Sequence, residues 1–206
     1  MNATEHEILA CQFCEWFPTF EKLTMKSKVI DLPEDFVRYL LQDGVVLPSS
    51  IAQAFGTDEL SDDDELTDVS ENCHNSPHFP QLTERIRNNI RELGGEVFVK
   101  LNWSAPIDTS WLSGGSMRCN RVADIFLQLK SSDRVVFDIE HMFDLCESNQ
   151  SHSNRNIEYK LVLRKWANLN PAMEFRLFVY RGTLKGASCV AISCSSLTVL
   201  IPRSCK

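Results

Sequence analysis

The chain has 206 residues, of which 43% are hydrophobic and 24% are charged, and its formal net charge is −7. This composition is ordinary for a globular domain, and an acidic chain lacks the basic footprint that general nucleic-acid binding needs. No apolar run approaches the roughly 20 residues that span a bilayer, so we expect neither a nucleic-acid nor a membrane partner.

The N-terminal region carries Glu5 and Glu7 in place of the basic segment of a signal peptide. We therefore expect the eight cysteines to be reduced thiols in a cytosolic or nuclear protein, and we predict a cytoplasmic one. Residues 7–20 place aromatic and aliphatic side chains at near-helical spacing and predict a helix that ends near Pro18. A strand is expected over 28–32, a helix after Pro33 and a short strand over 45–47.

Two groups of possible metal ligands occur in the sequence. Cys11 and Cys14 form a Cys-x-x-Cys pair, but no second pair lies nearby, which favours packing thiols over zinc or redox chemistry. Cys73, His74 and His78 form a loose trio in a polar segment. Its spacing is not that of a usual zinc site, so metal binding is disfavoured there as well.

An acidic segment separates the first elements from the rest of the chain. Residues 58–71 include eight Asp or Glu residues and no Lys or Arg. Self-repulsion and low apolar content predict a disordered insertion over 49–77. It is either a solvated linker or an acidic contact for a basic partner surface, and Ser61 suits an acid-directed kinase.

A helix is predicted over 78–93, ended by two glycines, and a strand over 96–103. Alternation puts Val97, Val99, Leu101 and Trp103 on one face of that strand and Phe98, Lys100 and Asn102 on the other. A lysine in an apolar strand is costly to bury without an anion. Lys100 is therefore a candidate phosphate contact, with a solvated edge-strand lysine as the alternative.

Further elements follow in the second half of the chain. We predict a helix over 122–130, strands over 134–139, 157–166 and 174–179, and a turn at Arg181-Gly182 into a returning strand over 184–187. Arg164 and Arg176 are predicted to lie on adjacent strands. In a cleft they would clamp an anion, because guanidinium matches phosphate bidentately, whereas on a plain hairpin they would face water.

Five blocks of the chain are distinctive: Lys100–Pro106, Asp124–Phe126, Leu129–Asp133, Leu161–Trp166 and Glu174–Arg176. At these blocks the sequence resembles the cell-division-cycle protein 123 family of eukaryotes. The opening around Cys11 and Trp16 and the acidic segment are also similar to that family, and the resemblance runs from about His6 to Ala187.

The resemblance implies an α+β, ATP-grasp-like fold with mixed or antiparallel sheets and flanking helices, which binds magnesium-ATP. It also implies an assembly chaperone that binds the gamma subunit of eukaryotic translation initiation factor 2 and so supports translation initiation and cell-cycle progression. In this reading Lys100, Arg164 and Arg176 contact the nucleotide. The pocket wall is formed by Trp103, Ala105 and Trp166, and Lys165 is a weaker candidate.

The sequence departs from the family at two places. Ile107 stands where the family usually carries a basic residue. Residues 188–206 replace the family's C-terminal half, which holds the magnesium ligands, so we expect an incomplete domain whose tail resembles a splicing or frame-shift product. The expected segments are 1–48, 49–77, 78–187 and 188–206. Alternatives are a carboxylate–amine ligase, and a shortened form that binds only the partner or is inactive.

Overall fold

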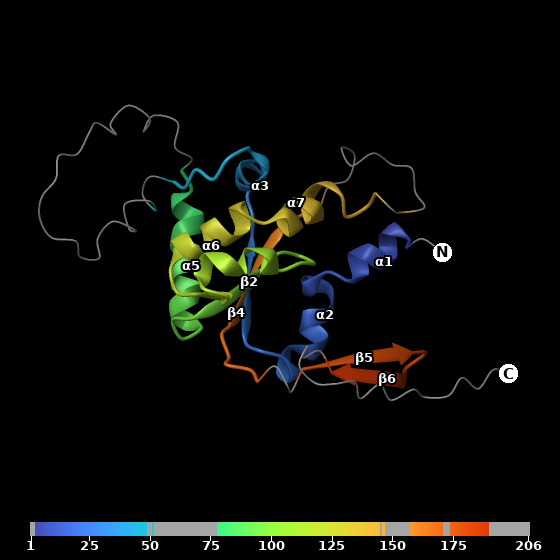
Figure 1. The fold of residues 1–206 in the computed structure, drawn as a ribbon. Coiled ribbons are helices and arrows are strands. Elements are labelled where there is room, and N and C mark those ends of the chain that lie inside the picture. The colour runs from blue at the N-terminus through green and yellow to red at the C-terminus, as the bar shows by residue number, and fades with distance from the viewer. Residues whose placement is uncertain are drawn as a thin grey trace, which may run out of the picture. The chain divides into compact units, whose positions relative to one another are not determined.

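The computed structural model of the chain describes residues 3–48, 51, 78–144, 146, 157–170 and 174–189 (Figure 1). The chain forms two compact units, Met1–Trp166 and Ala167–Lys206, which are described separately. Apart from Ile51, the predicted acidic insertion at 49–77 lies outside the described residues, and so do the predictions for Ser61, Cys73, His74 and the tail beyond residue 189.

A four-stranded antiparallel sheet forms the centre of the first unit. Its strands lie in the order β1 (Ser27–Asp31), β4 (Lys160–Lys165), β2 (Val97–Lys100) and β3 (Arg118–Cys119). In the register of β4, Leu163 lies opposite Val99 and Leu161 lies opposite Ile30. Helices and antiparallel strands in one unit confirm the expected mixture of α and β structure.

One face of the sheet packs against three helices, α3 (Glu34–Leu41), α5 (Pro80–Glu92) and α6 (Val122–Lys130). The ring of Phe36 contacts those of Phe79 and Phe126 edge-to-face, with centroids 5.1 and 5.0 Å apart. Full burial of each such side chain contributes about 1.5–3 kcal/mol. The buried residues of this face on the strands are Ile30, Val97, Val99, Leu161 and Leu163. Val97 and Val99 therefore share a face as predicted, but β2 ends at Lys100 and Trp103 lies beyond the strand.

The opposite face of the sheet contacts α2 (Phe13–Phe20), which follows α1 (Glu5–Ala10). A single helix over 7–20 was the wrong prediction, because the backbone of Gln12 is extended and the N–H of Phe13 donates to the carbonyl of Asn102 at 2.8 Å. Pro18 lies inside α2 and does not end it. The break between the helices lets Phe13 turn onto the sheet, where it is completely buried.

Two predicted strands were wrong. Residues 134–139 lie in a helix, α7 (Asp133–Glu140), because the hydroxyl of Ser132 caps its N-terminus by accepting from the N–H of Val135 at 3.3 Å. The buried Val135 and Ile139 are then one turn apart on the same side. Residues 45–47 form no strand, and no described strand pairs with them.

In the second unit, β5 (Phe175–Tyr180) and β6 (Thr183–Cys189) form an antiparallel hairpin. Arg181 and Gly182 both have positive φ, 48° and 70°, which is the backbone of a two-residue hairpin turn and confirms the predicted turn. Across the described ranges of both units, no helix is long and apolar enough to cross a membrane.

Candidate anion-binding site

Lys100 and Arg164 lie on the same face of the central sheet, the face that α2 covers. Lys100 is opposite Val162 in the ladder between β2 and β4, and Arg164 lies two residues beyond Val162, so their side chains point the same way. Both approach the ring of Phe13. The distances to its centroid are 5.4 Å from Nζ of Lys100 and 5.8 Å from Cζ of Arg164, within the range of cation–π contacts.

Arg164 is half-buried and incompletely bonded. Its Nη2 donates to the hydroxyl of Thr24 at 2.8 Å, but its Nε is buried without a hydrogen-bond partner in the described structure. Burial lowers the pKa of the guanidinium. A buried donor without an acceptor is costly, and the ligand type that best satisfies a guanidinium is a carboxylate or a phosphate.

Lys100 is also half-buried, and its ammonium donates to the carbonyl of Trp103 at 2.9 Å. Burial, followed by the nearby charge of Arg164, lowers its pKa to about 8, while Asp138 and Cys14 act in the opposite direction. Over the described ranges, no carboxylate lies within ion-pair distance of either cation. Two neighbouring cations without a carboxylate in direct contact are unfavourable, so the geometry suits an incoming anion.

The loop after β2 is held in place by two buried polar residues. Asn102 donates to Gln12 Oε1 and to the carbonyl of Glu158, both at 2.9 Å, and its Oδ1 accepts from the N–H of Lys160 at 2.7 Å. Asp138 of α7 accepts from the N–H and the hydroxyl of Ser104, both at 2.7 Å. The sequence gives no signal for a role of Asp138, because the strand predicted over 134–139 is in fact α7. The Ser132 cap could have revealed the helix.

Of the predicted wall residues, Trp103 and Ala105 lie in this loop, whereas Trp166 lies beside Glu96, at the other end of β2. The indole N–H of Trp103 donates to the carbonyl of Ile8 in α1 at 2.8 Å, and its ring lies edge-on to that of Phe143. The carbonyl of Ala105 accepts from the N–H of Ile107, where the 3₁₀-helix η4 (Ile107–Ser113) begins. The N–H of Trp166, just after β4, donates to the carbonyl of Glu96 at 3.0 Å. Trp103 is thus already engaged in holding α1.

Lys165 does not lie beside this pair of cations, and Arg176 belongs to the second unit. Lys165 is opposite Val97 in the sheet, on the face away from Lys100 and Arg164, with its stem beside Gly94. Arg176 lies in β5, whose partner is β6, while β4 is flanked by β1 and β2. The prediction that Arg164 and Arg176 lie on adjacent strands is therefore wrong.

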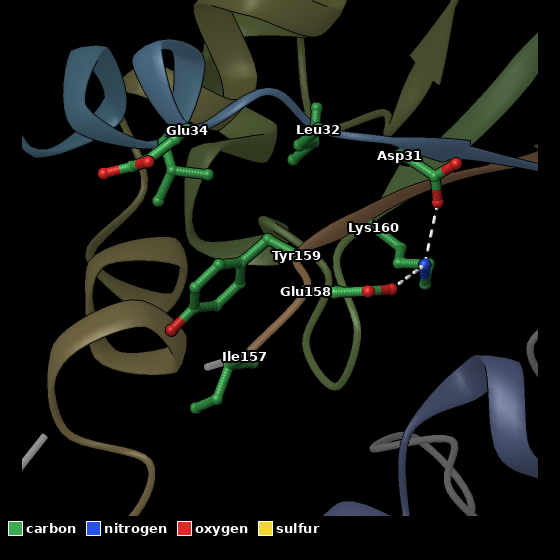
Figure 2. Close-up of a pocket in the computed structure, with 8 residues that line it drawn as sticks. Asp31, Leu32, Glu34, Ile157, Glu158, Tyr159 and Lys160 are labelled. Atoms are coloured by element: carbon green, nitrogen blue, oxygen red, sulfur yellow. Dashed lines mark hydrogen bonds and ion pairs between the residues drawn. The ribbon is translucent and has the colours of Figure 1, made fainter. Parts of the chain in front are cut away.

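A separate pocket lies at the start of β4, where Lys160 is surrounded by carboxylates (Figure 2). Its Nζ contacts Asp31 at 2.7 Å and Glu158 at 2.8 Å, and these hydrogen bonds raise the pKa of Lys160. The charge of Lys160 is therefore satisfied within the protein, unlike that of Lys100. No group of three or more His, Cys, Asp or Glu side chains in the described ranges is arranged to hold a metal ion.

The sequence of the chain is similar to those of a known protein family. The D123 family profile matches residues 16–193. A protein of Sclerotinia sclerotiorum named "Translation initiation factor eIF2 assembly protein" is 44% identical over 184 residues, which cover 85% of this chain and 45% of that protein. A Xenopus laevis protein of the same name is 39% identical over 192 residues, covering 89% of this chain and 56% of that protein.

The fold is similar to that of a solved structure. Cdc123 from Schizosaccharomyces pombe matches with a TM-score of 0.71 and 31% sequence identity, covering 91% of this chain and 65% of that one. The chain spans about half the length of the curated relatives that it matches.

Proposed function

Because the chain belongs to the D123 family, we propose that it takes part in assembling eukaryotic translation initiation factor 2, and that Lys100 and Arg164 bind the phosphates of ATP. The assembly role is supported by the printed names of the relatives from Sclerotinia sclerotiorum and Xenopus laevis. The observation that carries the nucleotide site is the pair of half-buried cations beside Phe13, with one guanidinium nitrogen unbonded.

The two cations are suited to different parts of a polyphosphate. The guanidinium of Arg164 presents several N–H donors in a fixed plane and can bind two oxygens of one phosphate, whereas the ammonium of Lys100 acts as a point charge. Both are shielded from bulk water by Phe13 and α2, which strengthens their attraction to an anion. The loop Leu101–Pro106 forms the adjacent wall, with Trp103 and Ala105 in it and Trp166 at the end of β4.

The described residues do not themselves provide a binding site for magnesium. Hard cations such as Mg²⁺ take carboxylate and phosphate oxygens, and the described residues provide no cluster of ligands for one. We therefore assign no magnesium ligand to the described residues, and Mg²⁺ would arrive with the nucleotide. Lys165 lies on the opposite face of the central sheet from the cation pair, and Arg176, in the second unit, stays a predicted contact.

The partner in this proposal is the gamma subunit of eukaryotic translation initiation factor 2, and the site of action is the cytoplasm, where translation starts. Binding of ATP then supports a chaperone role in translation initiation and cell-cycle progression, without a catalysed reaction. The ATP-grasp-like architecture that the family resemblance implies is part of the same proposal. No residue of the described site favours the alternative of a carboxylate–amine ligase.

Titration calorimetry with magnesium-ATP tests the nucleotide site. The purified chain is compared with Lys100→Ala, Arg164→Met and the control Arg38→Met, which changes an exposed arginine of α3 that pairs with Asp35. We expect saturable binding that the first two changes weaken at least about tenfold, since each removes a charged hydrogen bond. Equal affinity in all four proteins would rule out this site.

The assembly role is tested by co-precipitation of the gamma subunit with the same proteins. Binding that depends on magnesium-ATP and on Lys100 supports the full proposal. Binding of the gamma subunit by a chain that takes up no ATP supports the alternative in which only the partner surface is retained.

A further inference from the structure

Asp138 is a completely buried carboxylate whose contacts lie in the loop that follows β2. It reaches Ser104 from α7 with both oxygens, which accept from the backbone N–H and the hydroxyl at 2.7 Å each. In the described part of the chain, no basic side chain lies within ion-pair distance of it. A buried carboxylate held by two short, charge-assisted hydrogen bonds fixes the group that donates them.

The Trp103–Ser104 peptide bond joins Asp138 to Lys100. The carbonyl oxygen of this peptide belongs to Trp103 and accepts from Nζ of Lys100 at 2.9 Å. Its N–H belongs to Ser104 and donates to Asp138. Because a trans peptide is planar and its C=O and N–H point in opposite directions, a cation at one end and an anion at the other both stabilise the same orientation.

We infer that Asp138 is a positioning residue of the anion site, which acts through the Trp103–Ser104 peptide to hold the ammonium of Lys100 in place and to maintain its positive charge. This inference rests on the proposed nucleotide site. It adds a role for Asp138, which touches no ligand, and it identifies the peptide bond through which Asp138 acts.

The charged and titratable groups that face Lys100 come from three elements. Burial, followed by Arg164 on β4, lowers the pKa of Lys100, while Asp138 on α7 and Cys14 on α2 raise it. The effect is reciprocal: burial raises the pKa of Asp138, while the hydrogen bonds from Ser104 and then the charge of Lys100 lower it. Asp138 is therefore the one carboxylate among these groups, and its removal leaves Lys100 beside Arg164 without an opposing aspartate.

The test is a direct titration of Lys100 in the nucleotide-free protein. Lysine side chains carrying ¹³C-methyl groups are followed by NMR as the pH is raised, with Lys100→Met to assign the signal. In Asp138→Asn, which keeps the shape and removes the charge, we expect the Lys100 midpoint to fall by about one pH unit and magnesium-ATP to bind about tenfold more weakly at pH 8. In Ser104→Ala, which keeps the carboxylate, the midpoint should stay within about 0.3 units.

A second measurement covers the case in which Asp138→Asn does not fold. In Lys100→Met the carboxyl resonance of Asp138 should titrate at a higher pH than in the unmodified chain, because its cation is gone. An unchanged Lys100 midpoint in folded Asp138→Asn, or an unchanged Asp138 midpoint in Lys100→Met, overturns the inference. Both titrations are made without nucleotide, so a failure to bind ATP refutes the proposed function and leaves this link separately testable.

Discussion

Arg164 donates a hydrogen bond to the hydroxyl of Thr24 at 2.8 Å, across 140 positions in the sequence. Thr24 follows the 3₁₀-helix η1 (Glu21–Leu23), in the segment that leads from α2 to β1. It lines a hollow together with Phe17, Lys22 and Lys26. The guanidinium is thereby fixed at one nitrogen, while Nε is left without an acceptor in the described structure.

Thr24→Val should therefore weaken the binding of magnesium-ATP about threefold to tenfold, because it removes the acceptor that orients Arg164 and keeps the volume of the side chain. The free energy of unfolding should change by less than about 1 kcal/mol, since a single partly exposed hydrogen bond is lost. Calorimetric titration and urea denaturation measure the two quantities. An affinity equal to that of the unmodified chain would show that Thr24 does not position Arg164 for a ligand.

Lys100→Met should separate stability from binding. It removes a half-buried cation that lies beside another cation and replaces it with an apolar side chain of similar length, so the ligand-free protein should become more stable by about 1 kcal/mol. Binding of magnesium-ATP should be lost. Thermal unfolding with and without nucleotide gives both results. A destabilised Lys100→Met would mean that the hydrogen bond to the carbonyl of Trp103 outweighs the cost of burying the charge.

The stability of the ligand-free protein should depend on pH through Lys100. Its pKa is about 8 in the folded chain and 10.5 ordinarily, so below pH 8 both states are protonated and the buried charge opposes folding. Between pH 8 and 10.5 the unfolded state binds more protons, and the contribution of Lys100 to stability rises by about 3 kcal/mol. Subtracting the unfolding free energy of Lys100→Met from that of the unmodified chain at each pH removes the contribution of the tyrosines, which both proteins share. A difference that does not change with pH would contradict the assignment of this pH dependence to Lys100.

Much of the sheet could be predicted from the sequence because its strands are short apolar runs with clear alternation. Val97 and Val99 face the core and Lys100 faces the other side, as period-two spacing requires. The placement of Arg164 beside Lys100 could not be read in this way. It depends on the pairing of β2 with β4, which are separated by about sixty residues, and local patterns carry no information on such long-range register.

The strand wrongly predicted over 134–139 and the single helix wrongly predicted over 7–20 also have physical causes. The run Arg134–Ile139 is rich in β-branched residues, and the capping hydroxyl of Ser132 overrides that preference and starts α7. The break between α1 and α2 comes from Asn102, a residue far along the chain. Because of these two errors, Asp138 and Phe13 were not predicted as parts of the site: α7 carries Asp138, and the break between α1 and α2 places Phe13 against the sheet.

Asn102 should be the residue of the site whose loss costs the most stability. Its amide and carbonyl join α2, the end of β2 and the start of β4 through Gln12, Glu158 and Lys160, and it is completely buried. Asn102→Ala leaves three partly buried polar groups without partners, which is expected to lower the free energy of unfolding by about 2–4 kcal/mol.

In the same variant, α1 and α2 should detach from the sheet more often. The side chain of Gln12 loses its hydrogen-bond partner there, next to the hydrogen bond from the N–H of Phe13 to the carbonyl of residue 102. Hydrogen exchange of the amide of Phe13 should become faster in Asn102→Ala than the overall loss of stability explains. Asn88→Ala is the control, because Asn88 lies exposed on α5 and bonds only to neighbours on that helix among the described contacts. If both variants lose equal stability and the exchange of Phe13 is unchanged, Asn102 does not hold α2 over the two cations.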